Sequence, residues 1–237
     1  MVDTRFVAVI AVVVLMALFA VLVAFDRVGT SSRNAPAAAA VVVVDDSRQL
    51  LYAWTSAGLR GVVLLDATRD TSFVWIPPDS VPAPAVWPVA PVDLQAVYRE
   101  GVGRENVVWV GSKTGILRSV HYLMTPADFE AKVSGGRAVG ARGIAPDGQS
   151  VTANDEGYLR YLRASLPPDL GEPVVLNVDA SYFVDGTSEG LMAQLGDSLS
   201  DYRFITVNRA TDATDVPAPA RLEAERMAEI LRAGVSR

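Results

Sequence analysis

The stretch GVVLLD at residues 61–66 decides the fold class, because it is a continuous apolar run that ends in a carboxylate. Similar short apolar or β-rich runs recur along the chain, at residues 41–44, 106–111, 119–124, 173–179 and 202–208. Runs of this kind, without polar alternation, are typical of strands in a sheet that is covered on both faces. We therefore predict six strands in such a sheet.

Helical patterns separate several of these runs. They lie at 49–58 (QLLYAWTSAG), 92–100, 155–165 and 187–199, and a final helix starts near Pro219. In the final helix we expect Leu222, Met227, Ile230 and Leu231 to share the buried face. Strand and helix in alternation predict an α/β sandwich with a mainly parallel sheet.

The N-terminal segment FVAVIAVVVLMALFAVLVAF, residues 6–25, contains no charge, proline or glycine. A helix of roughly 20 residues spans a hydrocarbon core of about 30 Å. We expect a transmembrane anchor whose apolar surface includes Phe6, Leu15, Phe19 and Phe25. The alternative is a cleaved signal peptide, which the small residues at 34–40 would suit, but the apolar run exceeds the usual length of about 7–15 residues.

This anchor divides the chain into four parts. We expect a short tail at 1–5, the transmembrane helix at 6–25, a linker at 26–39 and one soluble domain at 40–237. A short N-terminus before a first apolar segment favours a signal-anchor topology. The expected location is therefore a single-pass membrane protein with an extracytoplasmic domain, periplasmic if the cell is Gram-negative.

Composition excludes some classes of function. The net charge of −6 argues against a nucleic-acid partner, and the absence of cysteine excludes disulfides and thiolate metal sites. A proline-rich stretch at 76–92, with Trp75 just before it and Trp87 within it, is either a connector or a docking strip for a partner protein.

Carboxylates follow several of the predicted strands. Asp45 and Asp46 follow the first strand, Asp66 and Asp70 the second, and Asp179 ends the strand at 173–179. Ligand sites in parallel α/β sheets lie at the carboxyl ends of the strands, and converging carboxylates suit a divalent cation. The alternative is that these residues cap the helices that follow.

Four segments resemble, in the same order, motifs of a poorly characterised branch of the arginase/histone-deacetylase-like superfamily. These segments are VVDDSRQLLYAW at 43–54, VVLLDATRD at 62–70, TGILRSVHYLMTP at 114–126 and VLNVDASYF at 175–183. The family patterns are V-V-E-D-H-x-x-x-L-x-x-W, L-I-H-I-D-A-H-x-D, G-I-V-R-x-I-Y-W-V-x-P and I-L-D-I-D-L-D-Y-F. The resemblance implies a three-layer α/β/α sandwich, and active members hold divalent ions that generate hydroxide for hydrolysis.

The sequence departs from the family where the metal ligands belong. Ser47 and Thr68 stand where the patterns have histidine, and Ser181 stands where they have the second aspartate. Asp66, Asp70 and Asp179 remain, and the only histidine, His121, lies in a different predicted strand. We therefore expect relict metal-site positions, no catalytic residues, no bound metal and no cofactor.

Three hypotheses follow. The leading one is a pseudoenzyme that is an accessory or structural subunit of a larger integral-membrane complex, with other subunits and the lipid bilayer as its partners. Respiratory, photosynthetic and transport complexes all qualify as hosts. The alternative is a membrane-tethered hydrolase of amide or guanidino substrates with a carboxylate-only metal site. The third is a sensor that binds a small ligand in the relict pocket.

Overall fold

A computed structural model describes most of the chain beyond residue 39. The described residues are 40–71, 102–134, 141–144, 150–153, 159–166, 170–171, 173–196 and 198–235. They belong to one compact unit, Ala38–Arg237. The expected transmembrane segment, the linker, the helix at 92–100, Trp75 and Trp87 lie outside them. No helix in these ranges has the length and apolarity needed to cross a membrane.

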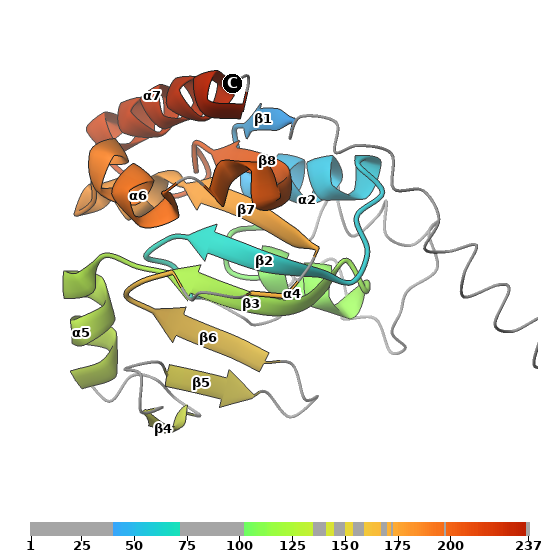
Figure 1. The fold of residues 1–237 in the computed structure, drawn as a ribbon, viewed down its shortest axis with the longest axis vertical. Coiled ribbons are helices and arrows are strands. Elements are labelled where there is room, and N and C mark those ends of the chain that lie inside the picture. The colour runs from blue at the N-terminus through green and yellow to red at the C-terminus, as the bar shows by residue number, and fades with distance from the viewer. Residues whose placement is uncertain are drawn as a thin grey trace, which may run out of the picture. The chain divides into compact units, whose positions relative to one another are not determined.

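The centre of the domain is an eight-stranded sheet with the order β1-β8-β7-β2-β3-β6-β5-β4 (Figure 1). The strands are β1 (Val41–Val44), β2 (Val62–Ala67), β3 (Leu117–Leu123), β4 (Ala141–Ile144), β5 (Ser150–Ala153), β6 (Leu159–Arg163), β7 (Val174–Asp179) and β8 (Tyr202–Asn208). The first six in this order pair in parallel, whereas β5 and β4 are antiparallel to their neighbours. The prediction of an α/β fold with a mainly parallel sheet is confirmed.

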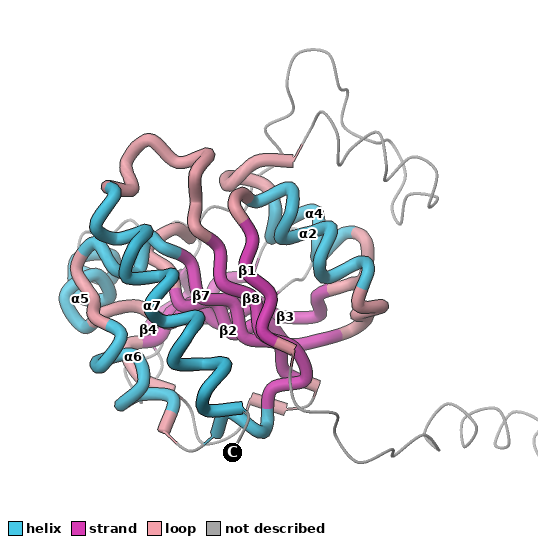
Figure 2. The backbone as a smooth tube through the Cα atoms, turned by 90° about the horizontal axis from the view of Figure 1, so that it is seen from above, coloured by secondary structure: helices cyan, strands magenta, loops and turns pink. Residues whose placement is uncertain are grey.

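Helices cover both faces of this sheet, as Figure 2 shows. Along β2, Val62 and Leu64 pack into one hydrophobic cluster, while Val63 and Leu65 pack into another. The first cluster includes residues of α2 (Ser47–Ser56) and α4 (Val107–Lys113), and the second includes residues of α6 (Ser188–Leu195) and α7 (Ala218–Val235). Since successive strand residues point to opposite faces, the fully buried run of β2 requires cover on both sides.

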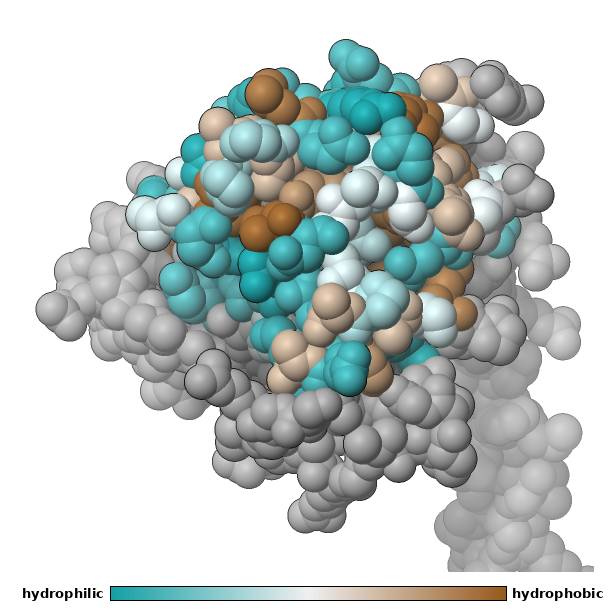
Figure 3. Space-filling model, turned by 90° about the vertical axis from the view of Figure 1, so that its left-hand side faces the viewer, coloured by the Kyte–Doolittle hydropathy of each residue, from teal (hydrophilic) through white to brown (hydrophobic). Residues whose placement is uncertain are grey.

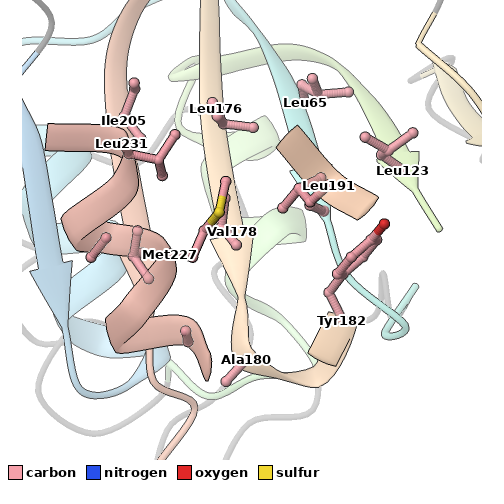
Figure 4. Packing of buried hydrophobic residues seen from close by; sticks show 14 of the residues in the cluster. Leu65, Leu123, Leu176, Val178, Ala180, Tyr182, Leu191, Ile205, Met227 and Leu231 are labelled. Atoms are coloured by element: carbon pink, nitrogen blue, oxygen red, sulfur yellow. The ribbon is translucent and has the colours of Figure 1, made fainter. Parts of the chain in front are cut away.

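The second cluster is shown in Figure 4, where Leu176 and Val178 of β7 face Met227 and Leu231 of α7. The remaining elements are α5 (Pro126–Ser134) and the 3-10 helices η1 (Ala180–Val184) and η2 (Ser198–Asp201). Figure 3 views the side toward which β2 and β3 point, and it shows hydrophilic residues interspersed with a few apolar ones.

Helix α2 begins with a reciprocal cap. The Asp46 side chain accepts a hydrogen bond from the backbone N–H of Gln49 at 2.9 Å, and the Gln49 side chain accepts one from the backbone N–H of Asp45 at 3.0 Å. Such caps satisfy N–H groups that have no partner within the helix. The helix then places Leu51 and Trp54 in the core and leaves Tyr52 exposed.

Two of the predicted elements have the wrong type. The apolar run at 106–111 forms helix α4, not a strand, because a short apolar run does not distinguish a strand from a buried helix. Gly111 lets this helix lie against β3, since a Cβ there would meet Leu117 Cδ1 at 2.9 Å. The predicted helix at 155–165 contains strand β6, which pairs with β3, so tertiary pairing overrides the local pattern.

Two predicted helices are confirmed with changed details. The segment 187–199 contains α6, which ends before Gly196 at a φ of 58°, followed by η2. In the final helix, Met227 and Leu231 are buried as expected, but Leu222 is 65% exposed. The buried face instead includes Ala220 and Ala224. Ala224 lies three residues before Met227, and Ala220 lies four residues before Ala224, which is the spacing of one helix face.

Leu51 and Tyr52, neighbours in α2, provide a test of which face of this helix packs into the core. Leu51→Ala should lower the free energy of unfolding by about 2–5 kcal/mol, because it opens a cavity beneath α2. Tyr52→Ala should change it by less than about 0.5 kcal/mol, since its side chain is exposed. Urea unfolding followed by circular dichroism measures both, and equal effects would contradict the assigned orientation of α2.

Candidate functional site

The strand order creates a switch point between β2 and β7. These strands are neighbours although more than 100 residues separate them in sequence. After β7 the chain continues into η1 and α6, whereas the first described helix after β2 is α4, which covers the opposite face. In parallel sheets, a ligand crevice forms at the carboxyl ends of two adjacent strands when the chain segments that follow them cover opposite faces of the sheet. The polar residues described below gather there.

A first row of polar side chains crosses the sheet beneath α2. Asp66 of β2 lies in register with Asn177 of β7, which lies in register with Thr206 of β8. Asn177 Nδ2 donates to Asp66 Oδ1 at 2.7 Å, and Thr206 Oγ1 donates to Asn177 Oδ1 at 2.8 Å. The indole of Trp54 donates to Thr206 Oγ1 at 3.4 Å. The row therefore links the buried Asp66 carboxyl to helix α2.

A second row lies two residues further along the strands. Asp179 is in register with Asn208 of β8, whose Nδ2 donates to Asp179 Oδ2 at 2.9 Å. The backbone N–H of Ser181 donates to Asp179 Oδ1 at 2.9 Å. Asn208 Oδ1 accepts the backbone N–H of Ala210 at 3.0 Å, where Ala210 has a φ of 50°. Asp179 thus has a partner on each carboxylate oxygen.

A hydroxyl pair connects the loops after β2 and β7. Thr68 Oγ1 and Ser181 Oγ lie 3.0 Å apart, and both residues are buried. Thr68 Oγ1 also accepts the backbone N–H of Asp70 at 3.0 Å, and Ser181 Oγ accepts that of Arg69 at 3.3 Å. These contacts hold the start of the loop after β2 against η1.

Arg104 lies at the edge of the site, just before α4. Its Nε lies 3.0 Å from Asp70 Oδ2, and its Nη1 donates to Asp215 Oδ1 at 2.5 Å. The Arg104 side chain is only 14% exposed, compared with 71% for Asp215. Burial alone would lower the pKa of Arg104, but the charges of Asp70, Asp179 and Asp215 raise it above its ordinary value. The guanidinium is therefore a permanent positive charge in the site.

A small pocket lies between α2, the start of α4 and the ends of the strands. Its volume is about 20 Å³, which is enough for one water-sized group. It is lined by three apolar residues, Leu50, Val107 and Val108, and by eight polar ones, Ser47, Asp66, Thr68, Asp70, Arg104, Asn177, Asp179 and Asn208. Ser47 is 1% exposed, and its Oγ has no hydrogen-bond partner among the described residues.

Burial makes a negative charge unfavourable on the two carboxyls at the strand ends, Asp66 and Asp179. Burial raises the pKa of Asp66 well above its ordinary value, and the nearby charge of Asp179 raises it further, while the hydrogen bond from Asn177 acts in the opposite direction. Burial also raises the pKa of Asp179, although hydrogen bonds from Ser181 counteract part of this. Within the described ranges, neither carboxyl has a lysine or arginine nitrogen within 4.0 Å.

The structure brings together the six positions singled out in the sequence. Five of them line the pocket, and the sixth, Ser181, contacts Thr68. His121 lies elsewhere: it is buried in β3, stacks on Tyr161 and accepts a hydrogen bond from Arg163 Nε at 2.7 Å. Burial and the charge of Arg163 lower the pKa of His121 to about 3, so it stays neutral.

These residues do not fit the metal that the family resemblance implies. In the part of the chain that the structure describes, no three histidine, cysteine, aspartate or glutamate side chains are placed to hold a metal ion together. Zinc and manganese hydrolase sites use nitrogen ligands with carboxylates around an open position. The described pocket is lined by carboxyls together with hydroxyls, amides and a guanidinium, and no histidine lines it.

Three residues of the site were not singled out from the sequence. Asn177 interrupts the apolar run VVLNVD and Asn208 ends YRFITVN, so a buried polar residue within a predicted strand was the available signal. Arg104 had no such signal, because its partner Asp215 lies 111 residues away.

A scan against protein-family models found no match to this chain, and searches of curated proteins and of solved structures also found none.

The raised pKa of Asp66 predicts a specific pH dependence. From its ordinary value up to the raised one, the folded state keeps a proton that the unfolded state has lost, so stability falls as pH rises through this window. In a buffer without small cations, Asp66→Asn should remove this part of the slope and make the protein more stable than the wild type at neutral pH. The isosteric amide still accepts the hydrogen bond from Asn177.

Thermal unfolding at a series of pH values measures this difference, and each unit of raised pKa corresponds to about 1.4 kcal/mol. Asp201→Asn serves as a control, since Asp201 is exposed on η2. A wild type that gains stability relative to Asp66→Asn as pH rises from acid to neutral would contradict the electrostatic description of the site.

Proposed function

We propose that this chain is a membrane-anchored, catalytically inactive accessory subunit of a larger integral-membrane complex. Its domain would be a degenerate, three-layer relative of arginase/histone-deacetylase-like hydrolases that braces or caps the extrinsic face of the complex. Two sequence features support the proposal: the apolar segment 6–25, which suits a membrane anchor, and the four motif-like segments without the family's histidines.

The observation that carries the pseudoenzyme proposal is the contact between Thr68 and Ser181. By the resemblance, these positions would hold a histidine and an aspartate that ligate the metal. Here their hydroxyls lie 3.0 Å apart and also accept backbone N–H groups. Side chains engaged in this way stabilise the loops around the pocket, and hydroxyls are weak replacements for an imidazole and a carboxylate as ligands of zinc or manganese.

The charge of the site supports the same conclusion. Arg104 pairs with Asp70, one of the three remaining carboxylates, and its field also acts on Asp66 and Asp179. A hydrolytic metal ion would have to bind beside this fixed positive charge. A domain in which Arg104 already neutralises one of these carboxylates is better suited to binding and bracing than to hydrolysis.

The bracing role follows from the proposed anchor. A single apolar helix would confine the domain to the membrane surface, where the neighbouring groups are lipids and the extrinsic parts of other subunits. The acidic net charge of −6 favours protein partners over nucleic acid there. We place the domain on the extracytoplasmic side, as the short N-terminus before the apolar segment favours.

Metal analysis separates the pseudoenzyme from the hydrolase. The full-length protein in detergent would be incubated with manganese or zinc, passed through a desalting column and assayed by mass spectrometry. We expect far less than one metal per chain, because the described site has no suitable ligand set. One tightly bound metal per chain, lost in Asp179→Ala and kept in Asp201→Asn, would contradict the proposal.

Extraction in a mild detergent tests the accessory role. The tagged full-length chain, expressed from its own locus, should migrate in a large complex and co-purify with multi-spanning membrane proteins in a fixed ratio. Deletion of residues 6–25 should abolish this association. Migration as a monomer with no stoichiometric partner would contradict the bracing function while leaving the metal result unaffected.

A further inference from the structure

We propose that the pocket binds one small monovalent cation, an alkali-metal ion or ammonium, between Ser47 Oγ and the carboxyl groups of Asp66 and Asp179. This inference goes beyond the proposed function, because it depends only on the described pocket. It assigns a ligand to a site that the pseudoenzyme proposal leaves without a role.

The first support is the buried hydroxyl of Ser47. Ser47 lines the pocket from the first turn of α2 and is 1% exposed, yet its Oγ has no hydrogen-bond partner among the described residues. Leaving a buried hydroxyl without a partner costs about 1–3 kcal/mol, so such groups are almost always satisfied by protein, water or an ion. The pocket is therefore expected to hold a group that contacts this oxygen.

The second support is the unused acceptor capacity of the two carboxyls. An ionised carboxylate offers about four lone-pair sites, but Asp66 accepts one side-chain hydrogen bond from Asn177, and Asp179 accepts one on each oxygen. Both carboxyls line the pocket without an ion-pair partner in the described part of the chain. A cation in the pocket would offset the cost of burying their charge.

Size and charge select a small monovalent ion. The volume of about 20 Å³ admits one water-sized sphere, which covers sodium, potassium and ammonium and excludes tetramethylammonium. Calcium takes about six to eight oxygen ligands and magnesium needs a near-ideal octahedron of them. No three acidic side chains in the described ranges are placed to share one ion. Arg104 and its partner Asp70 also line the pocket, which further disfavours a second positive charge on the ion.

The N-terminus of α2 does not favour an anion over a cation as the occupant of the pocket. A helix N-terminus attracts anions through its exposed N–H groups. Here the backbone N–H of Gln49 donates to Asp46, and that of Ser47 lies 3.4 Å from Asp212 Oδ2. With these donors engaged by carboxylates and two more carboxyls in the pocket, a cation is the favoured occupant.

The test compares thermal unfolding of the full-length protein in detergent in four chloride salts at equal ionic strength and neutral pH. The salts are those of sodium, potassium, ammonium and tetramethylammonium, the last being too large to enter. At a concentration of about ten times Kd, a bound ion should raise the midpoint by roughly 3 to 5 °C in a saturable manner. The ion that gives the largest shift at low concentration distinguishes an alkali metal from ammonium.

Variants locate the ion. Ser47→Ala and Asp66→Asn should both remove the difference between small cations and tetramethylammonium, whereas Asp201→Asn, at an exposed position, should retain it. Asp66→Asn is nearly isosteric, and Ser47→Ala gives a second readout if that variant folds poorly. Equal midpoints in all four salts, or an unchanged cation effect in Ser47→Ala and Asp66→Asn, would overturn the proposal. Neither result would bear on metal content or on membrane partners.

Discussion

The constraint on which the site depends is the burial of two carboxyl groups at the ends of adjacent parallel strands. Asp66 and Asp179 are each only 6% exposed. Buried charge is unfavourable unless it is paired or hydrogen-bonded. The structure meets this constraint mainly with neutral donors, since Asn177, Asn208 and the backbone of Ser181 contact these carboxyls directly.

This constraint explains why two rows of polar side chains cross the buried part of the sheet at the ends of β2, β7 and β8. Asn177 and Thr206 lie in register with Asp66, and Asn208 lies in register with Asp179, so each carboxyl finds its partner on the neighbouring strand. Trp54 completes the first row from α2, whose capped N-terminus also places Ser47 at the pocket. Arg104 pairs with Asp70 at the edge and leaves Asp66 and Asp179 to the neutral donors.

Much of the fold could be predicted from the sequence, because its central strands are buried on both faces and therefore read as continuous apolar runs. The run NVVWVG resembles a strand for the same reason, since most residues of this short helix are buried. Strand β6, with the sequence LRYLR, was missed because its pairing with β3 outweighs its local pattern.

The site was predictable only in part. Carboxylates and hydroxyls after apolar runs pointed to residues that the structure gathers at one pocket, since parallel strands place their carboxyl ends together. The strand order, which makes β2 and β7 neighbours, is a tertiary property that no local pattern contains. The role of Arg104 depends on that order and on contacts across 34 and 111 residues of sequence, which explains why the residue carried no signal of its own.

The most direct test of this account is the titration of Asp66 itself. Carbon-13 NMR of the side-chain carboxyls, with the Asp66 signal assigned from its loss in Asp66→Asn, measures the pKa without reference to unfolding. In a buffer without small cations, we expect Asp66 to titrate well above the ordinary value for aspartate, because burial and Asp179 outweigh the hydrogen bond from Asn177. An Asp66 carboxyl that titrates at or below the ordinary value would contradict the central claim.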